Sequence, residues 1–187
     1  MLKQGKLFVI SGPSGVGKDT LVGMILQGPA DLEKVVTATT RPPRTGERDG
    51  VNYWFLTAEE FDRRIREGEF LEWALVHGNR YGTPAPAVIE KLAQGISLVL
   101  AIDIQGAKSI RDEMREAVTI FIAPPSFKEL EKRLRGRSTE CDEEIDARIK
   151  AAEGEMAQMD RYDYAVVNTD LEQAAEELSQ IIKANTG

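Results

Sequence analysis

One segment near the N-terminus restricts the possible folds more than any other. Residues 7–27 read LFVISGPSGVGKDTLVGMILQ, in which an apolar run leads into three closely spaced glycines and a lysine. A short apolar run before a glycine-rich stretch predicts a buried strand, and Leu21, Met24 and Ile25 then follow at helical spacing. The segment therefore predicts a strand, a loop and a helix in succession.

The loop has the pattern G-x-x-x-x-G-K from Gly12 to Lys18. Glycines allow a tight turn that brings backbone N–H groups close to phosphate oxygens, and the following helix directs its positive end at them. Lys18 adds a mobile positive charge. Because the pattern stands between a predicted strand and a predicted helix, it indicates a nucleotide phosphate site rather than a glycine-rich turn with a chance lysine.

Composition excludes several classes of protein. The 187 residues suffice for one domain with a substantial core, and no apolar stretch approaches the roughly 20 residues of a membrane span. The lone cysteine, Cys141, excludes an internal disulfide, and with a lone histidine, His77, it argues against a zinc site. We expect a cytoplasmic protein.

The net charge of −7 argues against a general nucleic-acid surface. The positive charge is concentrated instead in two clusters, which could bind a small anionic substrate. They consist of Arg41, Arg44 and Arg48 in one predicted loop, and of Lys132, Arg133, Arg135 and Arg137 in one predicted helix.

Strand and helix patterns alternate along the rest of the chain. Apolar runs predict further strands at 96–103, 118–123 and 164–168, the first of them buried on both faces. Capping signals predict helices that begin at Thr57, at Thr83 and at Ser126, and charged amphipathic patterns predict two more at 142–156 and 170–184. This alternation predicts an α/β fold with a mostly parallel sheet sandwiched by helices.

The stretch TTRPPRTGERDGVNY, residues 39–53, forms a second group of candidate binding residues. Two prolines between Arg41 and Arg44 favour a polyproline conformation with three residues per turn, so that both guanidinium groups face the same way. Arginine suits phosphate oxygens, and Tyr53 could add a hydroxyl donor. A solvated basic loop is the alternative.

Two carboxylates are further candidates for ligand contacts, and for Glu72 the ligand could be a base. Glu72 stands among apolar neighbours, and a carboxylate can accept hydrogen bonds from the N1–H and 2-amino groups of guanine, whereas adenine offers no such edge. Asp103 follows an apolar run, at the strand end where ligands bind in open α/β sheets. A structural role for Glu72 and a helix cap for Asp103 are the alternatives.

Arginines in RLRGRSTECDEEIDAR, residues 133–148, suggest a flap over the phosphates. Phosphoryl transfer needs cations around the migrating group, and a closing flap supplies them while it excludes water. Arg137 and Arg148 fit this role better than Arg135, for which an exposed helical hairpin with ordinary salt bridges is the alternative.

Taken together, these segments resemble the guanylate kinases over nearly the whole chain. The matching stretches, in the same order and spacing, are VISGPSGVGK, TTRPPRTGERDGVNYWF, GEFLEWALVHGNRYGTP, IDIQGA, IAPPS, RLRGR and VVN. The resemblance implies a P-loop nucleoside monophosphate kinase fold with a core, a GMP-binding region at 35–86 and a lid at 126–155. It also implies transfer of the γ-phosphoryl group of ATP to GMP, with magnesium, in guanine nucleotide recycling and GTP supply.

The resemblance further implies roles for individual residues. The expected GMP contacts are Thr37, Arg41, Arg44, Tyr53, Glu72, Tyr81, Thr83 and Asp103. The expected ATP contacts are Gly12, Pro13, Ser14, Gly15, Val16, Gly17, Lys18, Asp19, Thr20 and Asn168. The expected catalytic groups are Lys18, Arg44, Arg137 and Arg148.

Two positions depart from the commonest pattern of that family. Asp19 follows Lys18 where Ser or Thr is usual, and Ala101 stands where an acid is common. We interpret Asp19 as supplying the magnesium-side charge that Ala101 lacks, directly or through water, with the Thr20 hydroxyl beside it. The alternative is that Asp19 only favours the start of the helix.

Other functions compete with this interpretation. A P-loop kinase of a phosphorylated sugar, such as ribose bisphosphate, could carry the same GKD sequence. A non-catalytic guanylate kinase-like module that binds a protein partner is a second alternative, which the intact loop disfavours. The oligomeric state, monomer or homodimer, stays open.

Overall fold

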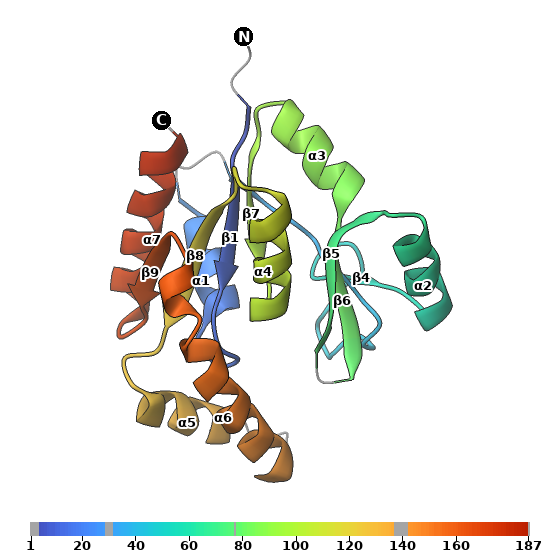
Figure 1. Cartoon of the computed structure of the whole chain (residues 1–187). Coiled ribbons are helices and arrows are strands. Elements are labelled where there is room, and N and C mark those ends of the chain that lie inside the picture. Colours follow the sequence, from blue (N-terminus) through green and yellow to red (C-terminus); the bar gives the residue numbers. More distant parts are fainter. Residues whose placement is uncertain (1–3, 29–31, 77, 137–141, 187) are drawn as a thin grey trace.

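The computed structural model describes residues 4–28, 32–76, 78–136 and 142–186, the side chains of 142–144 excepted. Its core is a five-stranded, all-parallel sheet in the order β2-β7-β1-β8-β9 (Figure 1). The strands are β1 (Leu7–Ser11), β2 (Leu32–Lys34), β7 (Ser97–Ala101), β8 (Val118–Ala123) and β9 (Tyr164–Val167). The mostly parallel sheet predicted from the sequence is confirmed.

Helices cover both faces of this sheet. On one face, α1 (Lys18–Ile25) and α7 (Leu171–Thr186) pack against Phe8 and Ile10 of β1. On the other face, α3 (Ala85–Ala93) and α4 (Ile104–Glu113) pack against Leu7 and Val9. Because alternate side chains of β1 point to opposite faces, each half of the strand's apolar run fills a different layer of the core.

A second, four-stranded sheet stands beside the core, in the order β4-β3-β6-β5 (Figure 1). Its strands are β3 (Ala38–Thr39), β4 (Trp54–Phe55), β5 (Phe70–Val76) and β6 (Asn79–Pro84), with α2 (Ala58–Arg66) between β4 and β5. β6 pairs antiparallel with both β3 and β5, whereas β3 and β4 run parallel.

A helical hairpin projects from the carboxyl-end side of the core sheet (Figure 1). It consists of α5 (Phe127–Arg135) and α6 (Asp142–Met156), and a short 3-10 turn at Met159–Arg161 leads from α6 to β9. The hairpin has a small core of its own, built around Leu130, Leu134 and Ile145. Among the described residues, no helix is both long and apolar enough to cross a bilayer.

Two of the three predicted helix caps are confirmed. The hydroxyls of Thr57 and Ser126 accept hydrogen bonds from the backbone N–H groups of Glu60 and Glu129, each at 3.2 Å. The predicted cap at Thr83 is wrong. This residue belongs to β6 and is fully buried, so its hydroxyl donates to a partner inside the second sheet, and the residue before α3 is Pro84.

Candidate active site

A cavity of about 630 Å³ opens between the carboxyl ends of β1 and β7, the second sheet and α6. Many of the residues singled out in the sequence line it, although they come from segments more than 130 positions apart. They are Gly12, Ser14, Gly15, Gly17, Lys18, Asp19, Thr20, Thr37, Arg41, Arg44, Tyr53, Glu72, Tyr81, Asp103 and Arg148.

The glycine-rich loop is shaped by contacts that leave no room for side chains. Gly12 has φ 142°, and a Cβ there would lie 2.3 Å from the carbonyl oxygen of Ile122 in β8. Gly17 has φ 96°, and a Cβ there would lie 2.7 Å from Nδ2 of Asn168. These glycines therefore fix the loop against the sheet while it keeps its backbone at the cavity wall.

Lys18 folds back over this loop. Its Nζ donates to the carbonyl oxygens of Gly12 at 2.6 Å and of Pro13 at 2.9 Å. The ammonium group is thus held at the cavity wall, beside the first turn of α1 and the dipole's positive end. A phosphate seated in the loop would meet both this charge and the loop's backbone N–H groups.

Asn168 stabilises the loop through a buried side-chain hydrogen bond. Its side chain is buried, and Nδ2 donates to the carbonyl oxygen of Val16 at 2.8 Å. Arg133 donates from Nη2 to the Asn168 carbonyl oxygen at 3.2 Å. Of the predicted ATP contacts, Pro13, Val16 and Asn168 do not line the cavity, and the Val16 side chain is fully buried in the core.

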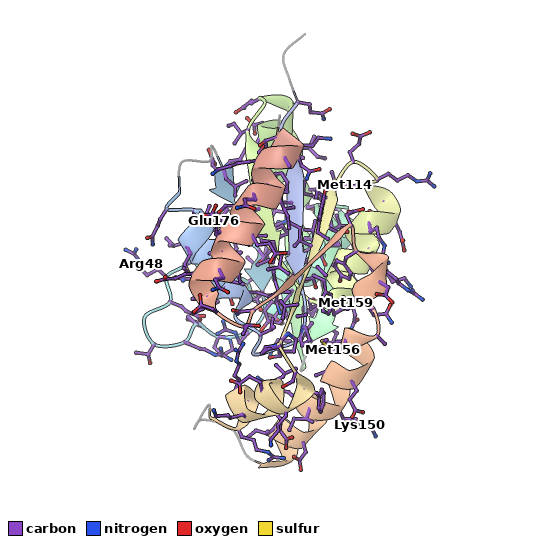
Figure 2. All side chains as sticks on the ribbon, turned by 90° about the vertical axis from the view of Figure 1, so that its left-hand side faces the viewer. Arg48, Met114, Lys150, Met156, Met159 and Glu176 are labelled. Carbon is purple, nitrogen blue, oxygen red and sulfur yellow. The ribbon has the colours of Figure 1, made fainter. Side chains whose placement is uncertain are left out.

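The arginine loop is organised around Glu47. Both carboxylate oxygens of Glu47 accept from the Arg41 guanidinium at 2.9 Å, and Oε2 also accepts from the backbone N–H of Arg44 at 2.7 Å. This pairing with Arg41 lowers the pKa of the Glu47 carboxyl. Arg41 and Arg44 line the cavity, whereas Arg48 lies on the outer side of the loop and points away (Figure 2).

Two tyrosines stand beside these arginines. The rings of Tyr53 and Tyr81 meet edge to face with centroids 6.0 Å apart, and the Arg41 guanidinium carbon lies 5.4 Å from the Tyr53 ring centre. Burial, with Asp19 nearby, raises the pKa of Tyr53 to about 12. The Tyr53 hydroxyl therefore stays protonated near neutral pH and can donate a hydrogen bond to an anion.

Glu72 is a buried acid at the far end of the cavity. Its side chain belongs to a residue only 6% exposed, and Oε1 accepts from the Thr83 hydroxyl at 2.5 Å. Burial raises the pKa of Glu72 to about 7, and the Thr83 bond opposes this rise. Glu72 therefore faces the cavity from inside the protein.

Asp103 caps α4 and also lines the cavity. Its Oδ1 accepts from the backbone N–H groups of Gln105 at 2.7 Å and of Gly106 at 3.2 Å. The expectation of a helix cap is thus confirmed, while the position at the end of β7 keeps the carboxylate beside Glu72. Thr37, which is also buried, lines the same cavity.

The family model for guanylate kinase matches residues 4–185. The chain belongs to the guanylate kinase family. Proteins described as guanylate kinase in Caldanaerobacter subterraneus subsp. tengcongensis and Rubrobacter xylanophilus are 48% and 47% identical to it over 182 residues. These alignments cover 97% of this chain in both cases, and 88% and 95% of the relatives.

Solved structures agree with the family assignment. The crystal structure of guanylate kinase from Anaplasma phagocytophilum matches with a TM-score of 0.83 and 38% identity, covering 100% of this chain and 89% of that one. Shikimate kinase from Bacteroides thetaiotaomicron is only 17% identical, with a TM-score of 0.52 and coverage of 95% and 98%, and shares the fold alone.

In this member of the guanylate kinase family, α6 brings a cation to the cavity. Arg148 lines the wall together with Ala147. Arg135 instead pairs with Glu131 at 3.0 Å and with Asp146 at 2.9 Å, the salt-bridge alternative considered for it. Three residues discussed from the sequence, Arg137, Cys141 and His77, lie outside the described residues.

Sequence reasoning missed Glu155, a cavity residue on the same helix. It follows Arg148 by seven positions, two helical turns, so both side chains project from one face of α6. Burial raises the pKa of the Glu155 carboxyl, and the nearby Lys18 opposes this rise. The spacing from Arg148 was the available signal. Asn79 and Val76, from the β5–β6 hairpin, were missed as well.

The residues beside the phosphate loop fit a magnesium ion held largely by substrate. Across the described parts of the chain, no group of three or more His, Cys, Asp or Glu side chains could form a cage. Asp19 and Thr20 line the cavity next to Lys18, and Ala101 faces it from β7. One carboxylate and one hydroxyl beside phosphates suit Mg²⁺, which keeps several waters.

Proposed function

We propose that this protein transfers the γ-phosphoryl group of ATP to GMP and so produces ADP and GDP. The observation that carries the proposal is a single cavity with a phosphate loop at one end and a buried, hydrogen-bonded glutamate at the other. The first end suits a nucleoside triphosphate. The second suits a base with N–H groups on its edge, as guanine has.

The proposed GMP site combines residues of the second sheet with residues of the loop between β3 and β4. Glu72 accepts hydrogen bonds from N1–H and the 2-amino group of guanine, with Asp103, Thr37 and Thr83 beside it. The GMP phosphate lies against the group of cations and hydroxyls that face the same cavity, namely Arg41, Arg44, Tyr53 and Tyr81. Because Glu47 holds Arg41 in place, its guanidinium is oriented before the substrate arrives.

In the proposed reaction, an oxygen of the GMP phosphate attacks the γ-phosphorus of ATP. The bond from that phosphorus to the bridging oxygen breaks, and its electrons remain on ADP. The protein's part is to align the two phosphates and neutralise their charge. Lys18, Arg44 and Arg148, which all line the cavity, do so in this proposal. Arg137 is assigned the same task from the sequence alone.

Magnesium fits this scheme as a cofactor, because a bound Mg²⁺ supplies charge neutralisation for the phosphate oxygens. Asp19 and Thr20 would hold it, directly or through water, at the start of α1.

We also propose that residues 35–86 form the GMP-binding region and that 126–155 form a lid over the transferred group. Whether the protein acts as a monomer or a homodimer is independent of this scheme.

A coupled assay that measures ADP tests the proposal directly. The purified protein is given ATP and Mg²⁺ with GMP, AMP, UMP, ribose bisphosphate or no acceptor. We expect rapid ADP formation with GMP alone. Ribose bisphosphate as the preferred acceptor would support the sugar-kinase alternative, and the absence of turnover with any acceptor would support a binding module.

A further inference from the structure

Gly106 packs next to the buried Glu72 carboxylate, which lies where a side chain on residue 106 would begin. This residue is the third of α4 and is itself buried. A Cβ built on it would lie 2.5 Å from Glu72 Oε2, 3.0 Å from Glu72 Cδ and 3.2 Å from Ile102 Cδ1. Carbon and oxygen atoms do not approach to 2.5 Å without a bond, so the carboxylate and a methyl group cannot share this position.

The backbone gives no reason for a glycine here. Gly106 lies within a helix and is absent from the glycines with positive φ, so any residue could adopt its conformation. Alanine would even be the better helix former. What a larger residue would meet at this position is the Glu72 carboxylate.

The Glu72 carboxylate has a neighbour on each side. From β6, the Thr83 hydroxyl donates a hydrogen bond to Oε1 at 2.5 Å. From α4, the backbone of Gly106 lies next to Oε2 and restricts the space in which that oxygen can move. The Gly106 N–H also donates to Asp103 Oδ1 at 3.2 Å. One residue thus borders both acids at this end of the cavity.

We propose that Gly106 is a positioning residue for base recognition, because its missing side chain leaves the space in which the Glu72 carboxylate is held against the cavity. The proposal rests on the function proposed above. A methyl group at residue 106 would push a flexible carboxylate aside and would leave the sheet and the phosphate loop in place. Recognition of guanine is lost, and ATP binding is kept.

The test compares Gly106→Ala with Gly23→Ala. Gly23 lies in α1, and a Cβ there has nothing within 4 Å, so it controls for a glycine-to-alanine change in a helix. We expect Gly106→Ala to raise the KM for GMP by about tenfold to a hundredfold, the loss of hydrogen bonds to a charged group. The KM for ATP should stay within about twofold of wild type, since no polar contact to the loop is changed.

A second substrate separates positioning from general damage. IMP lacks the 2-amino group, so the preference for GMP over IMP reports on the Glu72 carboxylate. We expect this preference to fall in Gly106→Ala and to persist in Gly23→Ala. If Gly106→Ala keeps the wild-type KM for GMP and the wild-type preference over IMP, the proposal is wrong. A wild-type protein that ignores GMP would contradict the proposed function instead.

A double-mutant cycle in thermal stability tests whether residue 106 and the Glu72 side chain compete for space, even if Gly106→Ala is too unstable for kinetics. Thermal unfolding is measured for wild type, Gly106→Ala, Glu72→Ala and the double variant. With Glu72 truncated, the two closest atoms are gone and the closest that the added methyl group then meets is Ile102 Cδ1, at 3.2 Å. Gly106→Ala should then lower Tm in the wild-type background and leave it unchanged or higher in the Glu72→Ala background. An equal drop in both backgrounds would show that Glu72 is not the group displaced.

Discussion

Glu72 and Thr83 are direct partners across the β5–β6 ladder, and the Thr83 hydroxyl donates to Glu72 Oε1 at 2.5 Å. Burial favours the neutral acid and raises its pKa to about 7, while this hydrogen bond favours the carboxylate and opposes the rise. The two effects leave Glu72 with a pKa in the physiological range. The proposed role of Glu72, to accept two hydrogen bonds from guanine, should therefore depend on Thr83.

Removing that hydroxyl should weaken GMP recognition. We expect Thr83→Val to raise the pKa of Glu72 further and to increase the KM for GMP by about tenfold or more. Thr83→Ser, which keeps the hydroxyl, should behave like wild type. The measurement is the KM for GMP of each variant from pH 6 to pH 9. For wild type, the KM should increase as the pH falls through about 7, because Glu72 becomes protonated. Identical profiles for Val and Ser would contradict the role of the bond.

The same acid should make stability depend on pH. Its folded pKa of about 7 exceeds the ordinary value of 4.5, so the folded protein binds more protons than the unfolded chain between these values. Stability is therefore lost as pH rises from about 4.5 through about 7. Glu72→Gln removes this loss, so its free energy of unfolding should exceed that of wild type by about 1–3 kcal/mol across that window. Urea unfolding at pH 5 and pH 8 measures the difference.

Glu47 offers a test of preorganisation in the arginine loop. Glu47→Gln removes the charge that holds Arg41 and the N–H of Arg44, so the KM for GMP should rise by about tenfold with little change in the KM for ATP. Glu60→Gln is a matched control, because Glu60 pairs with Arg63 and Arg64 on α2 away from the cavity. Equal effects of the two variants would argue against orientation of Arg41 by Glu47.

Lys18 should matter for turnover more than for GMP binding. Lys18→Met removes the charge at the loop and is expected to lower kcat by about 10²–10³-fold, as for other groups that stabilise transition-state charge. The KM for GMP should change little. Lys183→Met, at an exposed position on α7, controls for the loss of one positive charge. Steady-state kinetics at saturating GMP make the comparison.

Asp19 and Ala101 face one cavity, so their roles can be tested as a pair. If Asp19 supplies the magnesium-side charge, Asp19→Ser should raise the magnesium concentration needed for half-maximal turnover. Ala101→Asp should restore it in the double variant. Additive effects of the two substitutions would instead favour the alternative, in which Asp19 only stabilises the start of α1.

Local signals made much of the fold predictable. The order of apolar run, glycine loop and helix identified the carboxyl edge of the central sheet, because each step is encoded by neighbours in sequence. β2 was not predicted, since Leu32–Lys34 is short and not apolar. Its pairing with β7 is formed by tertiary contact alone.

The candidate site also combines features that local sequence predicts with features that only tertiary contacts determine. Arg41 and Arg44 stand out by residue type and spacing, but their partner Glu47 does not, since any nearby acid could have served. Thr83 reads as a cap because it precedes a helix, yet its position opposite Glu72 in the ladder decides where the hydroxyl goes. The pair belongs to an unbroken antiparallel register that runs from Val76 and Asn79 at the hairpin to Glu72 and Thr83, and a capping pattern in the sequence carries no information on this register.

The buried Glu72 carboxyl has a thermodynamic consequence for the binding of GMP. With a pKa of about 7, Glu72 is partly protonated near neutral pH, whereas the proposed hydrogen bonds to guanine require the ionised group. On the proposed contact, binding of GMP should release protons to the solution. The heat of binding should then vary with the ionisation enthalpy of the buffer, and the affinity for GMP should depend on pH.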